Sequence, residues 1–202
     1  MTKGLKTTLI VVGVIVVIGF MLYNFFVGNY NSMVTQEEGV KSAWSQVENV
    51  YQRRLDLIPN LVSTVKGYAK HEQDTFTKLA EARSQAGGVI KIDEDMLDDP
   101  EKFAKFQKAQ NQLGSSLQRL LAVAENYPEL KANQNFLDLQ SQLEGTENRI
   151  AVERKRYNEV VQQYNGFIRV FPKSFIANMF GFRPKAYFQA DEEASKAPKV
   201  EF

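Results

Sequence analysis

The residues of this chain that could do acid–base or metal chemistry are few and widely spaced. The only histidine, His71, is followed by Glu72, but Thr75 stands where a zinc-protease helix carries its second histidine. The chain has no cysteine, which excludes thiolate metal sites, thiol nucleophiles and disulfides. No serine lies in an elbow motif that could use His71 as its base. We therefore predict that the chain is not an enzyme and holds no metal or cofactor.

Two further segments have incomplete ligand-binding patterns. The acidic run from Asp93 to Asp99 resembles a calcium loop, but Asp98 replaces the glycine and Ala104 the glutamate that an EF-hand requires. The pair Gly87-Gly88 lacks the Lys-Ser/Thr of a phosphate-binding loop. A solvated loop is the expectation for the acidic run. The net charge of +1 offers no basic field, so nucleic acid is not an expected partner.

The N-terminal region contains one long apolar stretch. Residues Leu9 to Val27 include a single polar side chain, Asn24. At a rise of about 1.5 Å per residue this stretch matches a hydrocarbon core of about 30 Å. A cleaved signal peptide would have a shorter apolar region and a small-residue cleavage site, which residues 28–32 do not supply. We predict a single transmembrane helix over residues 9–27 that anchors the chain in a lipid bilayer.

Basic residues around this span predict its orientation. Lys3 and Lys6 precede the span, whereas the first basic residue after it is Lys41, beyond two glutamates. By the positive-inside rule the short N-terminus, residues 1–8, stays inside the cell. The expected location is therefore the cell membrane, with the remaining domain outside the cytoplasm.

Turn signals divide the rest of the chain into long helical segments. The first opens with a capping box at Thr35 and extends to about Gln85, and Pro59 inside it predicts either a bend around the bundle or a functional hinge. The second opens at Asp99-Pro100, and the third runs from about Ala132 to Phe171. The expected fold is all-α: a transmembrane helix, a linker over 28–34, an elongated antiparallel bundle of three long helices with a short C-terminal helix over 35–189, and a disordered tail over 190–202.

Apolar residues recur in these segments at alternating steps of three and four, as in a coiled coil. One polar side chain interrupts the seam of the second segment, and two interrupt that of the third. The second seam contains Phe103, Phe106, Gln110, Leu113, Leu117, Leu120 and Ala124, and the third Phe136, Leu139, Leu143, Thr146, Ile150, Glu153, Tyr157, Val160, Tyr164, Phe167 and Phe171.

Charged residues inside these seams must pair, because unpaired buried charge is costly. With the first and third helices parallel, Arg54 could meet Glu147, or Glu72 could meet Arg154. The two pairings exclude each other because their spacings along the helices differ. We prefer Arg54 with Glu147, since this register covers the early apolar stripe of the first helix.

These motifs, taken together, resemble the LemA family along nearly the whole chain. The resemblance implies a membrane-anchored antiparallel helical bundle, related to a magnetosome-associated protein, without an established catalytic activity or cofactor. Besides the N-terminal span, it is carried by Ala43-Trp44-Ser45-Gln46-Val47, the stretches 52–62, 65–72, 127–133 and 143–150, and by Arg156-Tyr157-Asn158, Tyr164-Asn165, Phe171-Pro172, Phe180-Gly181-Phe182 and Tyr187-Phe188.

A structural or scaffolding role at the cell envelope, with homo-oligomerisation, is the function that we expect. The alternative is an adaptor or regulator that docks a membrane protease or sensor, and hence a membrane-protein partner. In both cases polar residues of the seams and motifs are the candidates for setting helix register or making contacts. These candidates are Arg54, Asp56, Pro59, Asn60, Glu72, Glu147, Asn148, Arg149, Arg154, Tyr157, Asn158, Tyr164 and Asn165.

The segment after Pro172 carries more apolar surface than a loop normally exposes. We expect a short helix that caps the end of the bundle and so covers this surface. The other possibility is contact with a neighbouring subunit or with the bilayer surface. The residues concerned are Phe175, Ile176, Met179, Phe180, Phe182, Tyr187 and Phe188.

Overall fold

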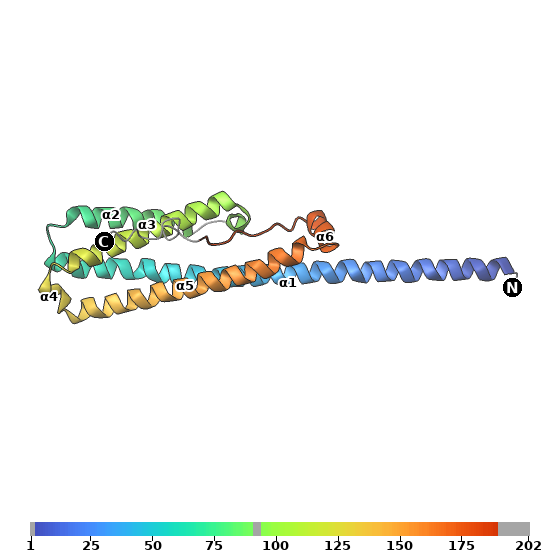
Figure 1. The fold of residues 1–202 in the computed structure, drawn as a ribbon, viewed down its shortest axis with the longest axis horizontal. Coiled ribbons are helices and arrows are strands. Elements are labelled where there is room, and N and C mark those ends of the chain that lie inside the picture. The colour runs from blue at the N-terminus through green and yellow to red at the C-terminus, as the bar shows by residue number, and fades with distance from the viewer. Residues whose placement is uncertain (1–2, 91–93, 190–202) are drawn as a thin grey trace, which may run out of the picture. The chain divides into compact units, whose positions relative to one another are not determined.

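The structure, a computed structural model, describes residues 3–90 and 94–189. All regular structure in these residues is helical, which confirms the all-α prediction (Figure 1). The predicted tail over 190–202 lies outside the described residues. The chain forms two compact units, one from Met1–Val40 and Gln162–Pro184 and the other from Lys41–Val161 and Lys185–Phe202. The helices are α1 (Lys3–Tyr68), α2 (Gln73–Ile90), the 3-10 helix η1 (Glu94–Asp98), α3 (Pro100–Ala124), α4 (Pro128–Lys131), α5 (Gln134–Arg169) and α6 (Lys173–Phe180).

The start of α1 differs from the sequence-based expectation. This helix is continuous from Lys3 to Tyr68, so residues 28–34 are helical and do not form a linker. Thr35 is not an N-cap, because its hydroxyl donates to the carbonyl of Asn31 at 2.9 Å inside the helix. α1 also contains the one segment of the described residues that is long and apolar enough to cross a membrane, and none of its most apolar window is buried.

Pro59 does not break the helix in which it lies. α1 continues through Pro59, whose side chain is exposed, and the helix ends at Tyr68. A turn follows, in which the amide of Glu72 donates to the carbonyl of Ala69 at 3.3 Å, before α2 begins. The reversal returns the apolar side of α2 to the core of the bundle. Its buried residues are Phe76, Leu79, Ala82 and Ala86.

This reversal changes the direction of every later helix in the second unit. As residue numbers rise along α1 through Trp44, Arg54 and Tyr68, the numbers of their partners fall through Tyr157 and Glu147 on α5 to Asn133, which directly precedes α5. α1 and α5 are therefore antiparallel, whereas the sequence-based register placed them parallel. α2 and α3 lie side by side (Figure 1), and the side-chain Nε2 of Gln110 on α3 donates to the backbone carbonyl of Ala86 on α2 at 3.4 Å.

The seam predicted for the second segment is confirmed, because α3 buries all seven of its members. The buried residues of α5 follow the predicted seam as far as Tyr157, and beyond it the burial pattern shifts by one residue at two positions. Val161 and Ile168 are buried there in place of Val160 and Phe167, and Phe171 is 84% exposed. A straight helix of 3.6 residues per turn drifts from a 3.5-residue repeat, which accounts for the shift.

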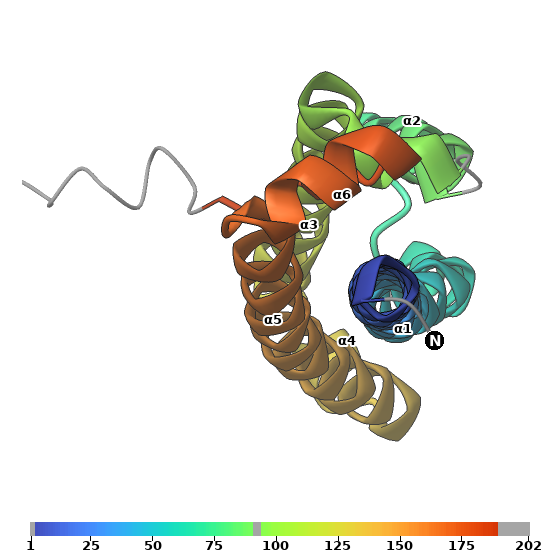
Figure 2. The same cartoon turned by 90° about the vertical axis from the view of Figure 1, so that its right-hand side faces the viewer.

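The first unit contains the predicted short C-terminal helix, α6. Figure 2 shows α6 lying across the view while the N-terminal part of α1 is seen end-on. The ring of Tyr30 on α1 contacts Phe180 at 4.9 Å and Phe182 at 5.8 Å between centroids. Ile176 and Ala177 are buried, but Phe175, Met179 and Phe180 are each more than half exposed. The chain itself therefore leaves these three residues uncovered.

Candidate functional site

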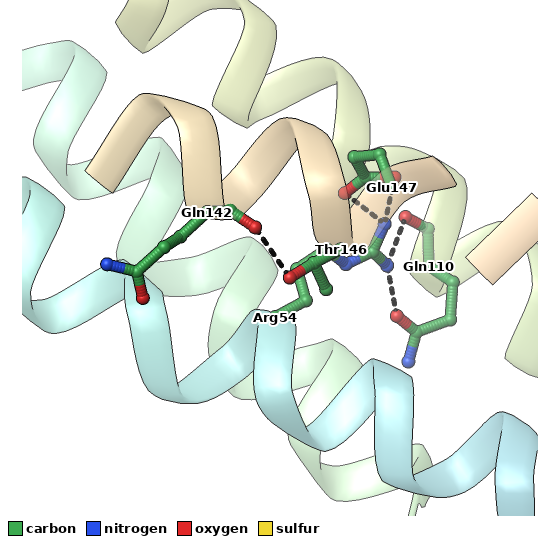
Figure 3. A network of polar contacts seen from close by, with 5 residues as sticks. All are labelled: Arg54, Gln110, Gln142, Thr146 and Glu147. Atoms are coloured by element: carbon green, nitrogen blue, oxygen red, sulfur yellow. Dashed lines mark hydrogen bonds and ion pairs between the residues drawn. The ribbon is translucent and has the colours of Figure 1, made fainter. Parts of the chain in front are cut away.

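The first polar site of the bundle is centred on the guanidinium of Arg54, which is 3% exposed (Figure 3). Its Nη1 donates to both carboxylate oxygens of Glu147, at 3.1 and 3.3 Å. Its Nη2 donates to the backbone carbonyl of Gln110 at 3.2 Å and to the side-chain oxygen of the same residue. The guanidinium also lies 5.0 Å from the ring centroid of Tyr51. Arg54 therefore joins α1 to both α3 and α5.

This geometry confirms the preferred pairing of Arg54 with Glu147, although the helices that carry them are antiparallel. Gln110, the polar member of the α3 seam, extends the network to α2 through its bond to Ala86. Thr146 is buried next to Glu147 and is satisfied within its own helix, because its hydroxyl donates to the carbonyl of Gln142 at 2.7 Å. The charge of Arg54 is thus neutralised and hydrogen-bonded where four helices meet.

The alternative pair, Glu72 with Arg154, is not formed. Glu72 accepts a hydrogen bond from the hydroxyl of Tyr127 at 3.3 Å. Arg154 instead donates to the backbone carbonyl of Gln189 at 3.4 Å and stacks over the ring of Phe188 at 4.7 Å. The two residues therefore belong to different sites of the bundle.

The second polar site holds the extended residues Lys185–Gln189, which we call the tail segment. The side chain of Asn158 donates to the carbonyl of Phe188 at 3.0 Å and accepts from its amide at 2.9 Å. Gln107 makes the same reciprocal pair with Gln189, at 2.7 and 3.1 Å. Two side-chain amides, one on α3 and one on α5, thus replace the main-chain partners that a neighbouring strand would supply.

The ring of Phe188 fills an aromatic box in the same site. Its centroid lies 4.9 Å from that of Phe103, 5.5 Å from Tyr157, 6.1 Å from Trp44 and 6.4 Å from Phe106. These rings come from α1, α3 and α5, so the tail segment contacts three helices through one side chain. Burial of such an aromatic ring supplies a large apolar contribution to the stability of the bound segment.

The other end of the tail segment is held by η1 and Tyr157. The buried ammonium of Lys185 pairs with Asp98 at 2.6 Å, and the amide of Ala186 donates to the carbonyl of Leu97 at 2.8 Å. The hydroxyl of Tyr157 donates to the carbonyl of Ala186 at 3.1 Å. Burial, together with the charge of Asp98 and with Tyr187, raises the pKa of Tyr157, so this phenol remains a neutral donor.

The described residues of the acidic run, 94–99, have structural roles. Asp98 binds Lys185, and Asp99 caps α3 by accepting from the amides of Glu101 and Lys102 at 2.9 and 3.2 Å. Asp93 lies outside the described residues. Among the residues that the structure describes, no three or more His, Asp or Glu side chains are grouped closely enough to hold a metal ion.

The remaining predicted site residues fall into two groups. Tyr164 and Asn165 belong to the first unit, where both are buried, and both have interaction partners. The other group is exposed on α1 and α5, where Asp56 accepts from Gln52 at 2.8 Å within α1. This exposed group consists of Asp56, Pro59, Asn60, Asn148 and Arg149.

Several residues of the two sites were not among the sequence-based candidates. Gln110 was recognisable as the polar member of an apolar seam, and Phe188 as one aromatic of the C-terminal segment. Nothing in the sequence marked Gln107 as a site residue, because glutamine is common beside the apolar seam of any solvent-exposed helix. The residues added by the structure are Asp98, Gln107, Gln110, Lys185 and Phe188.

The geometry can hold helices in register and bind an extended peptide segment through its main chain. Together with the exposed apolar segment of α1, it defines a helical-bundle protein with one candidate membrane span among residues 3–90 and 94–189. Residues 43–202 match the LemA family, and the chain belongs to that family.

Curated relatives agree with this assignment. The chain is 28% identical to the protein named magnetosome protein MamQ 2 of Paramagnetospirillum magneticum, over 98% of this chain and 77% of that protein. It is 27% identical to magnetosome protein MamQ of Magnetospirillum gryphiswaldense, over 85% of this chain and 68% of the relative. The protein named LemA of Metamycoplasma hominis is 24% identical, over 85% of this chain and 74% of its own length. The predicted family resemblance is thereby confirmed.

Proposed function

We propose that this chain is a single-pass, membrane-anchored scaffold of the cell envelope that acts without catalysis and assembles with copies of itself. The observation that carries the proposal is the use of its buried polar groups. Arg54 is neutralised by Glu147 and held by Gln110, so these groups connect helices. The MamQ relatives are named after a cellular structure rather than a reaction, which supports a structural role.

The proposed topology places the N-terminus inside the cell and the second unit outside the cytoplasm. Lys3 and Lys6 precede the apolar segment, and Glu37 and Glu38 are the first charged residues after it. Because the chain lacks cysteine, Val152→Cys at an exposed position of α5 creates a single labelling site. A membrane-impermeant maleimide should label it in intact spheroplasts as strongly as after lysis. Labelling only after lysis would reverse the topology.

The scaffold is tested by crosslinking the full chain in intact membranes, followed by mass spectrometry. Self-crosslinks that persist when the protein is expressed at a low level support homo-oligomeric scaffolding. A stoichiometric crosslink to a different membrane protein, without self-crosslinks, would replace scaffolding with the adaptor function.

One observation favours this adaptor function as the second candidate. Asp56, Pro59, Asn60, Asn148 and Arg149 lie in the stretches that resemble the LemA family, yet their side chains are exposed and contribute little to the core. Exposed polar residues of this kind can contact a partner. The double variant Asn148→Ala/Arg149→Ala should abolish a foreign crosslink if the chain is an adaptor, and should leave self-crosslinks and melting temperature unchanged if it is a scaffold.

A further inference from the structure

The first unit has an exposed apolar surface that consists of one side of α6 and two residues just before Pro172. Three of its residues recur at steps of four: Phe171, which precedes α6, and Phe175 and Met179 on α6, which are 84%, 63% and 53% exposed. Val170 and Phe180 extend the surface. A monomeric soluble protein rarely leaves so many adjacent large apolar side chains in water, which indicates that something covers them. We call these five residues the α6 surface.

The position of α6 relies on contacts inside the first unit. Phe180 and Phe182 contact the ring of Tyr30, at 4.9 and 5.8 Å. Tyr30 follows Val27, the last residue of the apolar segment, by less than one helical turn, or about 5 Å. A headgroup layer is about 5–8 Å thick, so Tyr30 and its aromatic partners fall within it when residues 9–27 span the bilayer.

The orientation of α6 fits the same location. α6 lies crosswise to the N-terminal part of α1 (Figure 2). If α1 crosses the bilayer, α6 then lies roughly in the plane of the membrane surface, as interfacial helices do. Phenylalanine and methionine side chains on one side of such a helix can enter the boundary between headgroups and acyl chains.

The charges around α6 complement an anionic surface. Residues Gln162–Pro184 contain no Asp or Glu but include Arg169, Lys173 and Arg183. The ammonium of Lys173 lies 3.6 Å from the ring centroid of Phe167, so this basic side chain remains beside the aromatic residues. Glu37 and Glu38 on α1 lie about 15 Å beyond Val27, outside the headgroup layer.

We propose that the α6 surface docks onto the phospholipid bilayer that α1 crosses, so that the protein holds its membrane at two places. This inference rests on the proposed membrane anchoring. The contact between Tyr30 and α6 makes the surface continuous with the apolar span, and the three basic residues favour anionic phospholipid. A second copy of the chain is the competing occupant.

The test uses the full-length chain in vesicles of phosphatidylcholine and phosphatidylglycerol in equal parts. Asn178→Cys places an environment-sensitive dye on the exposed side of α6 without removing an apolar residue. Ile15→Cys labels the span, and Val152→Cys labels an exposed apolar position in the second unit. Quenching is measured with nitroxide-labelled lipid and with iodide in the water phase.

We expect nitroxide lipid to quench the dye at residue 178 several-fold more than at 152, and iodide to quench it less. Phe175→Ser, or Arg169→Glu with Arg183→Glu, should reduce the nitroxide quenching at 178 and leave that at 15 unchanged. Quenching at 178 equal to that at 152, with the span still quenched at 15, would overturn the docking and leave the anchor intact. Protection of 178 from both quenchers would overturn it in favour of a protein neighbour. No quenching by nitroxide lipid at 15 would refute the anchor itself, and the docking with it.

Discussion

Arg54 and Glu147 form an ion pair at 3.1 Å in which the arginine side chain is 4% exposed and the glutamate side chain 43% exposed. The asymmetry means that the two partners respond differently to loss of the other. Without Arg54, Glu147 can be solvated by water. Without Glu147, the guanidinium is left buried with Gln110 and the ring of Tyr51 but without a counter-charge, and an uncompensated buried charge is strongly destabilising.

We predict that Arg54→Ala is much more damaging than Arg53→Ala. Arg53 is exposed, so its removal should change the free energy of unfolding by no more than about 0.5 kcal/mol. Breaking a buried pair costs about 3–5 kcal/mol, and the partial exposure of Glu147 places Arg54→Ala at the lower end, about 3 kcal/mol. Chemical denaturation of the full chain in detergent measures both variants. Equal midpoints for the two would refute the role of Arg54.

We predict that each of the two side-chain amides, Asn158 and Gln107, protects a different main-chain amide of the tail segment. Asn158→Ala should accelerate hydrogen exchange at the amide of Phe188, which donates to Asn158. Gln107→Ala should accelerate exchange at the amide of Gln189 instead. Exchange followed by mass spectrometry with fragmentation, or by NMR, resolves the two amides. If both variants accelerate all of the tail segment equally, Phe188 rather than the amides holds it.

We predict that Phe188→Ala destabilises the bundle by about 3–5 kcal/mol, the usual cost of removing a buried phenylalanine ring. The neighbouring Tyr187→Ala is the matched control, because Tyr187 is 40% exposed. A shortened chain that ends at Pro184 keeps α6 but loses the tail segment, and its melting temperature should fall by on the order of 10 °C. A chain that ends at Pro172 should lose little more. A much larger loss for the shorter chain would assign the stabilising contacts to α6.

Glu48 gives the bundle a pH dependence of stability. Burial raises the pKa of this carboxyl, while a hydrogen bond from the Trp44 side chain acts in the opposite direction. A folded-state pKa above the unfolded value means that the folded chain binds more protons, so this group lowers stability as pH rises through both values. Glu48→Gln keeps an acceptor for Trp44. It should raise the melting temperature at pH 7, and the gain should disappear near pH 4.

Glu81→Gln, at an exposed position of α2, is the control for this experiment. Denaturation curves of the wild type and both variants across this pH range isolate the contribution of Glu48. A gain from Glu48→Gln that does not change with pH would show that ionisation of Glu48 is not its cause.

The α3 seam could be predicted from the sequence because helical periodicity is a local property. Phe103 to Ala124 repeat without a break, and each member is buried. The turn at Ala69–Glu72 could not be predicted in this way. It contains no proline, and Gly67 before it is a weak signal, so the apolar pattern continued into what is a separate helix.

Because the turn at Ala69–Glu72 was not predicted, the direction predicted for α5 was also wrong. The Arg54–Glu147 pair was preferred on the assumption of parallel helices, and it forms between antiparallel ones because two opposite charges in facing seams can meet in either direction. The parallel arrangement was wrong because the direction of α5 depends on how many turns precede it. The site around Phe188 was also beyond prediction, since Asn158 and Gln107 recognise main-chain atoms that every residue has.

The position of Trp44 in the aromatic box allows its intrinsic fluorescence to report on the tail segment. Trp44 is the only tryptophan of the chain, and its ring is stacked with that of Phe188 at an interplanar angle of 22°. Any event that withdraws the tail segment replaces this neighbour with water around the indole. The fluorescence emission of the unlabelled, purified protein should then move to longer wavelength, so displacement of the tail segment can be followed in real time in detergent or in reconstituted vesicles without adding a dye.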